Sequence, residues 1–192
     1  MPDLSSIYRT ENGVVLIELK LRKIHQLFNT LDPSPFLEKD MDPEAEEYIV
    51  DAMLDIGPGK PVKLLIYLPD PDDEEENADT LAAAIRHYFA YRHKAARQDL
   101  SQLFQQGRWS LVTGLLFLVA CTVGRAAMVW LSVSPLVLPV MDEGLLIMGW
   151  VAMWRPLQVF LYDWWPIRRR IKIMRQLSGI TVEIRSSETM EV

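Results

Sequence analysis

The sequence has little of the chemistry that metal and redox sites need: one cysteine and three histidines in 192 residues. Because a disulfide needs two cysteines, no intrachain bridge can form, and this count is typical of a reducing cytoplasm. His87 and His93 are six residues apart, so on a helix they point to different faces and cannot chelate one ion as a pair. We therefore expect neither a structural disulfide nor a metal site.

Motifs that hold nucleotides or activate a nucleophile are also missing. The turn at residues 57–61 contains two glycines but lacks the spacing of a phosphate-binding loop, and no serine stands in a nucleophile elbow. Cys121 lies inside an apolar segment, where a thiol stays protonated and is a poor nucleophile. No catalytic residue and no cofactor are expected.

An excess of positive charge is absent as well. The formal net charge is -6, with the acidic residues concentrated between 32 and 79 and the basic residues next to the apolar segments. This distribution differs from the uniformly basic surface of a nucleic-acid-binding protein, so no nucleic-acid partner is expected. Residues 1–10 are polar and lack the apolar core of a signal peptide, so we expect no cleavable signal.

Two long apolar segments dominate the second half of the chain, at residues 109–132 and 144–162. A membrane-spanning helix needs about 20 mostly apolar residues, a length that each segment reaches only by including one arginine. The connecting loop, residues 134–141, has no lysine or arginine. The sequence predicts a two-helix transmembrane hairpin over residues 109–165. The alternative is a pair of helices buried in a soluble core, and the flanking residues favour the membrane.

The flanks of the hairpin predict its orientation. Lysine and arginine cluster before the first segment and after the second, and such residues stay on the cytoplasmic side of a membrane. We therefore expect a multi-pass protein of the inner membrane with both termini in the cytoplasm. Tryptophan rings prefer the headgroup level, and basic residues attract anionic lipids of the inner leaflet. The expected interfacial anchors are Trp109, Trp164, Trp165, Arg168, Arg169 and Arg170.

The remaining sequence predicts a small cytoplasmic α+β domain. Alternation of apolar and polar residues indicates three strands, at 13–22, 62–68 and 180–185. A helix between the first two favours a parallel pair. A lone terminal strand needs a sheet to join, so the third strand is expected to complete the same sheet. Two helices are expected before residue 57, a short one over 24–31 and a capped one from Asp42.

The fold class is therefore an α+β membrane protein with a hairpin inserted into a three-stranded domain. Its expected parts are a cytoplasmic part (1–79), a long stalk helix (80–108), the hairpin (109–165), and a basic interfacial helix with the closing strand (166–192). Gly107 is a possible hinge between stalk and hairpin. The acidic run within residues 69–79 is expected to be a solvated linker, which is favoured over a cation site because no glycine-turned ligand loop is present.

Two ionisable residues, Arg125 and Glu143, are expected at comparable depth in the two spans. A charge inside a bilayer costs a few kcal/mol, about 2.5–3.5 on insertion scales. An ion pair from Arg125 to Asp142 or to Glu143 across the hairpin would relieve this cost. We favour this structural role over a role in transport.

Arg155 stands inside the second span, before Pro156 and with no carboxylate close in sequence on that helix. Pro156 removes a backbone hydrogen bond and is expected to kink the helix. Two interpretations of Arg155 remain open. It lines a water-filled path or a contact between subunits, or its side chain extends to the cytoplasmic headgroups near Trp164 and Trp165.

Glycines in the spans favour close helix contact, as small residues do in bilayers. None of Gly114, Gly124, Gly144 and Gly149 lies four residues from another, so the dimerisation signal is weak.

Residues 148–156, with the sequence Met-Gly-Trp-Val-Ala-Met-Trp-Arg-Pro, and the Asp-Trp-Trp-Pro-Ile-Arg-Arg-Arg run at 163–170 resemble uncharacterised bacterial inner-membrane proteins. The resemblance implies a bacterial membrane origin and nothing about chemistry.

Three functions remain as hypotheses. The first is a non-enzymatic inner-membrane protein that self-assembles into a scaffold or a pore, because two spans bury little protein surface alone. The second is a membrane-tethered adaptor that recruits a soluble protein through the acidic run and an exposed strand edge. The third, a lipid-modifying enzyme, has the least support, with only Asp163, His87 and His93 as acid–base candidates.

Overall fold

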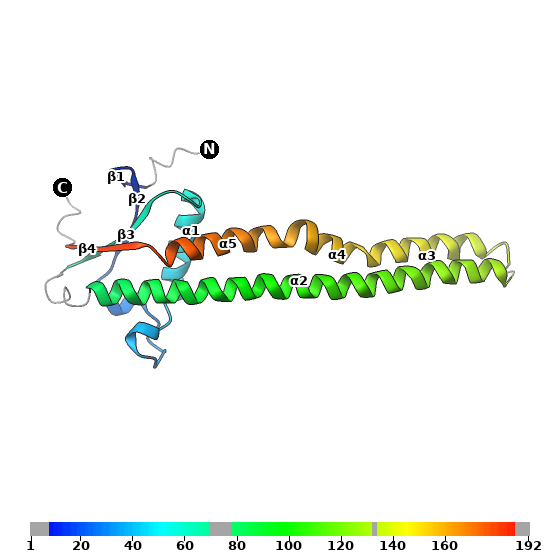
Figure 1. Cartoon of the computed structure of the whole chain (residues 1–192), viewed down its shortest axis with the longest axis horizontal. Coiled ribbons are helices and arrows are strands. Elements are labelled where there is room, and N and C mark those ends of the chain that lie inside the picture. The colour runs from blue at the N-terminus through cyan, green and yellow to red at the C-terminus, as the bar shows by residue number, and fades with distance from the viewer. Residues whose placement is uncertain (1–7, 70–77, 132–133, 187–192) are drawn as a thin grey trace. The chain divides into compact units, whose positions relative to one another are not determined.

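The computed structural model describes residues 8–69, 78–131 and 134–186. It is a mixed α+β structure with a four-stranded sheet and long helices (Figure 1). Two compact units divide the chain: unit 1 comprises Met1–Ala96 with Arg169–Val192, and unit 2 comprises Arg97–Arg168. The strands and α-helices are β1 (Thr10–Glu11), β2 (Val14–Lys20), α1 (Pro43–Ile56), β3 (Val62–Leu68), α2 (Ala78–Trp130), α3 (Leu138–Ala152), α4 (Trp154–Gln158), α5 (Trp164–Leu177) and β4 (Thr181–Ser186).

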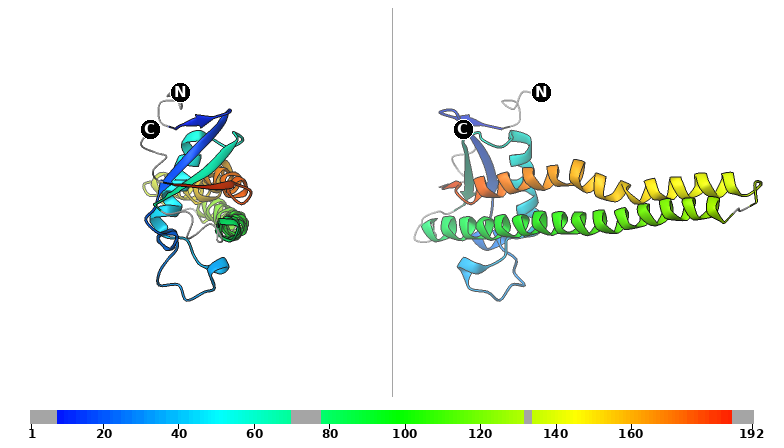
Figure 2. Two further views of the ribbon diagram at one scale, coloured as in Figure 1. Left: turned by 90° about the vertical axis from the view of Figure 1, so that its left-hand side faces the viewer. Right: turned by 45° about the vertical axis from the view of Figure 1, so that its right-hand side comes forward.

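The sheet of unit 1 has the strand order β1-β2-β3-β4 (Figure 2). β2 and β3 pair in parallel, as do β3 and β4, so the terminal strand joins the sheet as the sequence predicts. The expected strand count of three is one too low, because β1 pairs antiparallel with β2. Asn12 and Gly13 connect them with φ angles of 52° and 79°. Two positive φ angles define a type I′ hairpin turn, for which Asn-Gly is the strongest short sequence signal.

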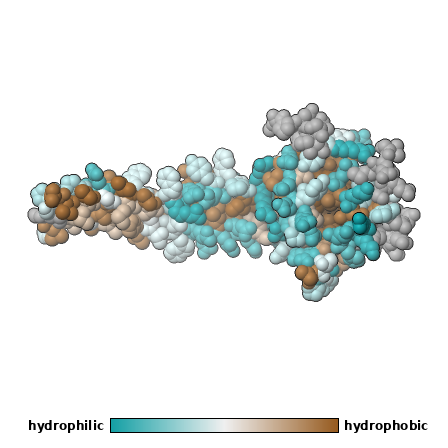
Figure 3. Space-filling view, turned by 180° about the vertical axis from the view of Figure 1, so that it is seen from behind, coloured by the Kyte–Doolittle hydropathy of each residue, from teal (hydrophilic) through white to brown (hydrophobic). Residues whose placement is uncertain are grey.

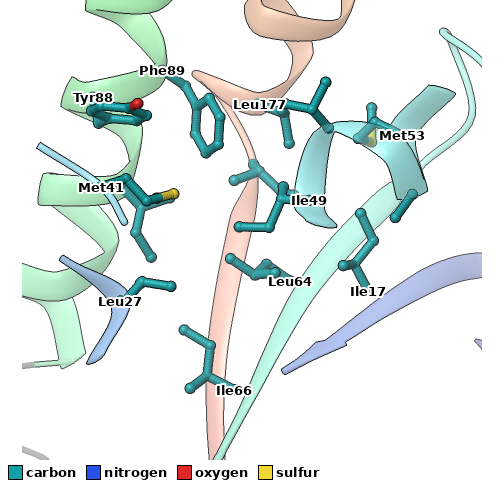
Figure 4. Packing of buried hydrophobic residues seen from close by; sticks show 14 of the residues in the cluster. Ile17, Leu27, Met41, Ile49, Met53, Leu64, Ile66, Tyr88, Phe89 and Leu177 are labelled. Carbon is teal, nitrogen blue, oxygen red and sulfur yellow. The ribbon is translucent and has the colours of Figure 1, made fainter. Parts of the chain in front are cut away.

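One face of this sheet packs against α1, α2 and α5, and Figure 4 shows the apolar side chains between them. Leu64 and Ile66 of β3 belong to this core, whereas Leu65 and Tyr67 pack with Leu16 in a separate cluster. The alternation predicted from the sequence therefore places successive β3 residues on opposite faces. Because all of these side chains are at most 2% exposed, both faces of the sheet are covered at this position.

Ion pairs cross the second face of the sheet. The guanidinium of Arg185 donates to Glu11 at 3.0 and 3.1 Å and to Glu183 at 2.7 Å, and Lys63 Nζ donates to Glu183 at 2.7 Å. Hydrogen bonds from Lys63 and Arg185 hold the pKa of Glu183 below its ordinary value. The hydrogen bond from Arg185 does the same for the pKa of Glu11. The cluster thus links β1, β3 and β4, which are distant in sequence.

Helix α1 has the ends that its sequence predicts. The Asp42 side chain accepts a hydrogen bond from the Glu44 amide at 3.0 Å, Pro43 occupies the first turn, and Gly57 follows the helix with a φ of 86°. By contrast, the helix expected over residues 24–31 is wrong: only a 3-10 turn forms, at Ile24–Leu27. The side chain of Asn29 accepts from the Leu31 amide, and this local hydrogen bond competes with helix continuation.

Helix α2 runs without a break from Ala78 through Gly107 to Trp130, so the expected stalk and the first apolar segment form one helix (Figure 1). Its first part contributes Leu81, Ile85 and Phe89 to the core of unit 1. The basic helix expected before the last strand is present within α5. Most of the acidic run, residues 70–77, lies outside the described residues, so its expected role stays a prediction.

Candidate functional site: the apolar helical pair

Two helices are long and apolar enough to cross a membrane, by length and composition: Ala78–Trp130 and Leu138–Leu177. Within the apolar 18-residue windows of these helices, only 11% and 17% of the residues are buried. Many large apolar side chains between Trp109 and Trp165 are 39–86% exposed, among them Leu116 at 65% and Val151 at 66%. In Figure 3, hydrophobic side chains cover the part of this helical pair that contains the end of α2 and the start of α3.

The two helical segments of unit 2 pack antiparallel. The close contacts are Gly107 with Val159, Gly114 with Ala152, and Leu118 with Gly149. Residue numbers therefore increase along α2 while they decrease along the returning segment. Among the described residues of unit 2, six are buried: Gly107, Gly114 and Cys121 of α2, and Gly149, Pro156 and Val159 of the returning segment. We call these six residues the seam.

The seam follows a spacing of seven residues. Gly107, Gly114 and Cys121 are each seven apart, as are Gly149 and Pro156. Seven residues are close to two helical turns, so each series lies along one face and meets the other continuously. A Cβ at Gly114 would lie 2.8 Å from the Ala152 carbonyl oxygen. The sequence signal for close packing is therefore present, at a spacing of seven instead of the four that is usual for glycine motifs.

Of the two partners that the sequence offers to Arg125, Asp142 and Glu143, the structure places Asp142 against it. Arg125 Nε lies 2.6 Å from Asp142 Oδ1 and Nη2 lies 2.8 Å from Oδ2, a two-point contact between α2 and α3. Such paired hydrogen bonds fix geometry as well as charge. Of the two acidic residues that the sequence offers, Glu143 stays outside this contact: it is exposed, and no ion pair with it is found among the described residues.

Arg155 also has a carboxylate partner, contrary to the expectation that none lies close in sequence on its helix. Its Nη1 lies 3.2 Å from Asp163 Oδ2. In a regular α-helix, residues eight apart are rotated by about 80° from one another, but a π-helical turn at Val159–Asp163 inserts an extra residue. The spacing then acts like seven, which brings Asp163 onto the face of Arg155. Arg155 therefore reaches toward the C-terminal end of its segment.

The expected anchors at the start of α5 bind protein groups. The Trp164 ring nitrogen donates to the Phe160 carbonyl at 2.9 Å, and the Arg168 guanidinium lies 4.9 Å from the Trp164 ring centre. In unit 1, Arg169 donates to the Leu54 carbonyl at 2.6 Å, and Arg170 lies 3.6 Å from Glu46. Trp109 and Trp165 are 66% and 64% exposed, and the Trp165 ring contacts the edge of the Trp164 ring.

Sequence reasoning missed a partly buried polar cluster in unit 1, centred on Glu46. Arg92 donates to Glu46 Oε1 at 2.9 and 2.6 Å, and Tyr88 donates to Oε2 at 2.7 Å. Burial, and next the hydrogen bond to Glu46, raise the pKa of Tyr88. Because Glu46 lies on α1 and its partners on α2 and α5, the cluster fastens three helices together. Its signal in the sequence, a Tyr and an Arg four residues apart on a helix, is too common to be specific.

No known protein family, curated protein sequence or solved structure matches this chain. Within the described ranges, no group of three or more His, Cys, Asp or Glu side chains is arranged to hold a metal ion.

Proposed function

We propose that the helical pair of unit 2 spans a lipid bilayer as a hairpin, and that the chain is a non-enzymatic protein of the bacterial inner membrane. The exposure of the apolar pair carries this proposal. Soluble monomers rarely expose contiguous apolar patches larger than a few hundred Å². Helices buried in a soluble core would have most of their apolar residues covered, whereas 11% and 17% are buried here. Lipid is the simplest cover for such a surface.

Both termini are proposed to face the cytoplasm. The basic residues of unit 2 at Arg97, Arg108 and Arg168 lie at the ends of the two segments away from their connection. Residues 134–141 beside the connection carry no lysine or arginine. Basic residues near membrane ends stay cytoplasmic, so this asymmetry orients the hairpin.

Self-assembly into a scaffold is the second part of the proposal. Glu143 is exposed, and no ion pair with it is found among the described residues, whereas the adjacent Asp142 pairs with Arg125. A charge without a partner in a bilayer is costly. A neighbouring copy at this position would shield it from lipid. The seam is closed by contacts to glycine, so a pore would have to form between copies and not within one pair.

The test is a mass measurement on the full chain in lipid nanodiscs after extraction of membranes at alkaline pH. We expect the chain to stay with the membranes and to give a mass of several copies. Release into the supernatant would contradict the membrane proposal, and a monomer mass would contradict self-assembly. The adaptor hypothesis depended largely on the acidic run that lies mainly outside the described residues, and it stays a prediction.

A further inference from the structure

We propose that Arg108, Trp109, Trp154 and Arg155 form a belt that contacts the phosphate headgroups of the inner leaflet. The proposal rests on the proposed membrane-spanning function and adds the position of the boundary. It places the cytoplasmic boundary of the hydrocarbon core at Trp109 and Trp154, and not at Trp164 and Trp165, where the predicted hairpin ends in the sequence. We refer to these four residues as the belt.

The antiparallel register puts the belt residues at one level. Gly107 faces Val159 and Gly114 faces Ala152, so Trp109 lies opposite about residue 157, close to Trp154 and Arg155. Trp165 lies about eight residues beyond that level, or about 12 Å at a rise of about 1.5 Å per residue. The two groups of tryptophans therefore cannot both mark the same boundary of an upright hairpin.

Tilting the pair does not remove the offset. Packed helices lie about 8–10 Å apart, so an offset of about 12 Å across the pair would need a tilt of about 50°. Membrane helices tilt by about 20° on average and by at most about 40°. The boundary must therefore follow one group or the other.

The polar residues of α2 indicate which group of tryptophans lies at the boundary. The segment of α2 opposite Phe160 and beyond it exposes Gln102, Gln105 and Gln106. A boundary at Trp165 would place these amides in hydrocarbon, where an unsatisfied polar group costs several kcal/mol. From Trp109 to Trp130, the helix is apolar except for Arg125, which pairs with Asp142. This stretch is about 22 residues, or about 33 Å, long, which matches a hydrocarbon core of about 30 Å.

The belt residues have the properties of interfacial contacts. Trp109 and Trp154 are 66% and 72% exposed, and Arg108 is exposed beside them. The Arg155 side chain is 56% exposed and reaches toward Asp163, away from the connection between the two helices. A guanidinium has five N–H donors, so the contact with Asp163 leaves donors for a phosphate oxygen. Trp164, in contrast, already donates its ring N–H to Phe160 and lies under Arg168.

Accessibility to a membrane-impermeant maleimide in inverted membrane vesicles tests the boundary. Single cysteines are placed in a Cys121→Ala background at Leu161 and Gln105, between the two possible boundaries. Leu115→Cys, inside both, and Lys172→Cys, outside both, are the controls. We expect Leu161→Cys and Gln105→Cys to label like Lys172→Cys. Protection of both, as for Leu115→Cys, would overturn the belt. Strong labelling of Leu115→Cys would instead contradict the membrane proposal itself.

Retained lipid tests the headgroup contact. Native mass spectrometry of the full chain, released from vesicles of phosphatidylglycerol and phosphatidylcholine, counts the lipids that stay bound. We expect Arg108→Gln with Arg155→Gln to lower retained phosphatidylglycerol at least twofold. Arg97→Gln, which removes an exposed arginine outside the belt, should not lower it. Equal retention by the double variant and the Arg97→Gln control would contradict a phosphate contact at the belt.

Discussion

Gly114 of α2 faces the backbone oxygen of Ala152, at a distance where an added Cβ would lie 2.8 Å from that oxygen. Pro156, four residues after Ala152, has no amide hydrogen to donate back to this oxygen. The proline therefore exposes a carbonyl on the face that meets α2, and the glycine makes room for it. A backbone atom cannot rotate away as a side chain can, so this contact sets how closely the two helices approach.

Gly114→Ala should separate the helical pair and destabilise it by about 1–3 kcal/mol, the usual cost of overpacking. Gly144→Ala is the matched control, since an added Cβ there meets no atom within 4 Å. Unfolding of the full chain in mixed micelles, followed by circular dichroism, measures both. Equal stability of the two variants would show that the close approach at Gly114 is not required.

The Arg125–Asp142 contact should show coupling in a double-mutant cycle. Arg125→Gln or Asp142→Asn alone leaves one charge without its partner, so each should destabilise the pair. The double variant should lose less than the sum of the two single losses. Glu143→Gln combined with Arg125→Gln is the control, and its effects should add, because Glu143 is not in this contact. If the losses of stability from Arg125→Gln and Asp142→Asn were also additive, the ion pair would not stabilise the contact between the helices.

Local patterns in the sequence were sufficient for much of unit 1. Alternation in β3, the Asp42 cap and the final strand all depend on residues close together in the chain, and the structure has them in the expected places. We did not predict the hairpin turn at Asn12 and Gly13, although the sequence contains its signal, because that dipeptide favours two positive φ angles. The prediction of a short helix over 24–31 was wrong. Apolar spacing favoured a helix there, but side-chain hydrogen bonds to the backbone stabilise a different local structure.

The geometry of the helical pair was harder to predict from the sequence, because it depends on which residues of the two helices face one another. Which residue of α2 faces Ala152 follows from packing along the whole seam, and no local pattern contains it. The π-helical turn at Val159–Asp163 shifts every later residue by one position, so an α-helical wheel misplaces Asp163 relative to Arg155. In the antiparallel register, the end of the predicted hairpin at Trp165 does not lie opposite its start at Trp109.

Tyr88→Phe should destabilise unit 1 by about 1.5–3 kcal/mol, the usual contribution of a hydrogen bond to a charged group. The pKa of Tyr88 is raised by burial and by Glu46, so the folded state holds its proton more tightly than the unfolded state. This contribution is complete below the unfolded pKa near 10 and is lost as pH rises above it. The loss of stability above pH 10 should therefore be smaller in Tyr88→Phe than in the parent, as measured by urea unfolding. If stability fell equally with pH in Tyr88→Phe and in the parent, the loss above pH 10 could not be assigned to Tyr88.

The ion pairs on the second face of the sheet predict an acid-sensitive unit 1. Arginine and lysine hydrogen bonds lower the pKa values of Glu11 and Glu183, so the folded state releases their protons more readily than the unfolded state. Their contribution is present above the unfolded pKa near 4.5 and is lost as pH falls through the lower folded values. Arg185→Gln removes the shared partner of both carboxylates. It should lower stability at pH 7 and flatten the decline below pH 4.5, measured by thermal unfolding across pH.

Arg86→Gln is the control, because it removes the same positive charge. Arg86 donates to the Ala82 carbonyl of its own helix, so the loss of stability of this variant in acid should follow that of the parent. A parent-like slope in Arg185→Gln would assign the acid sensitivity to other carboxylates.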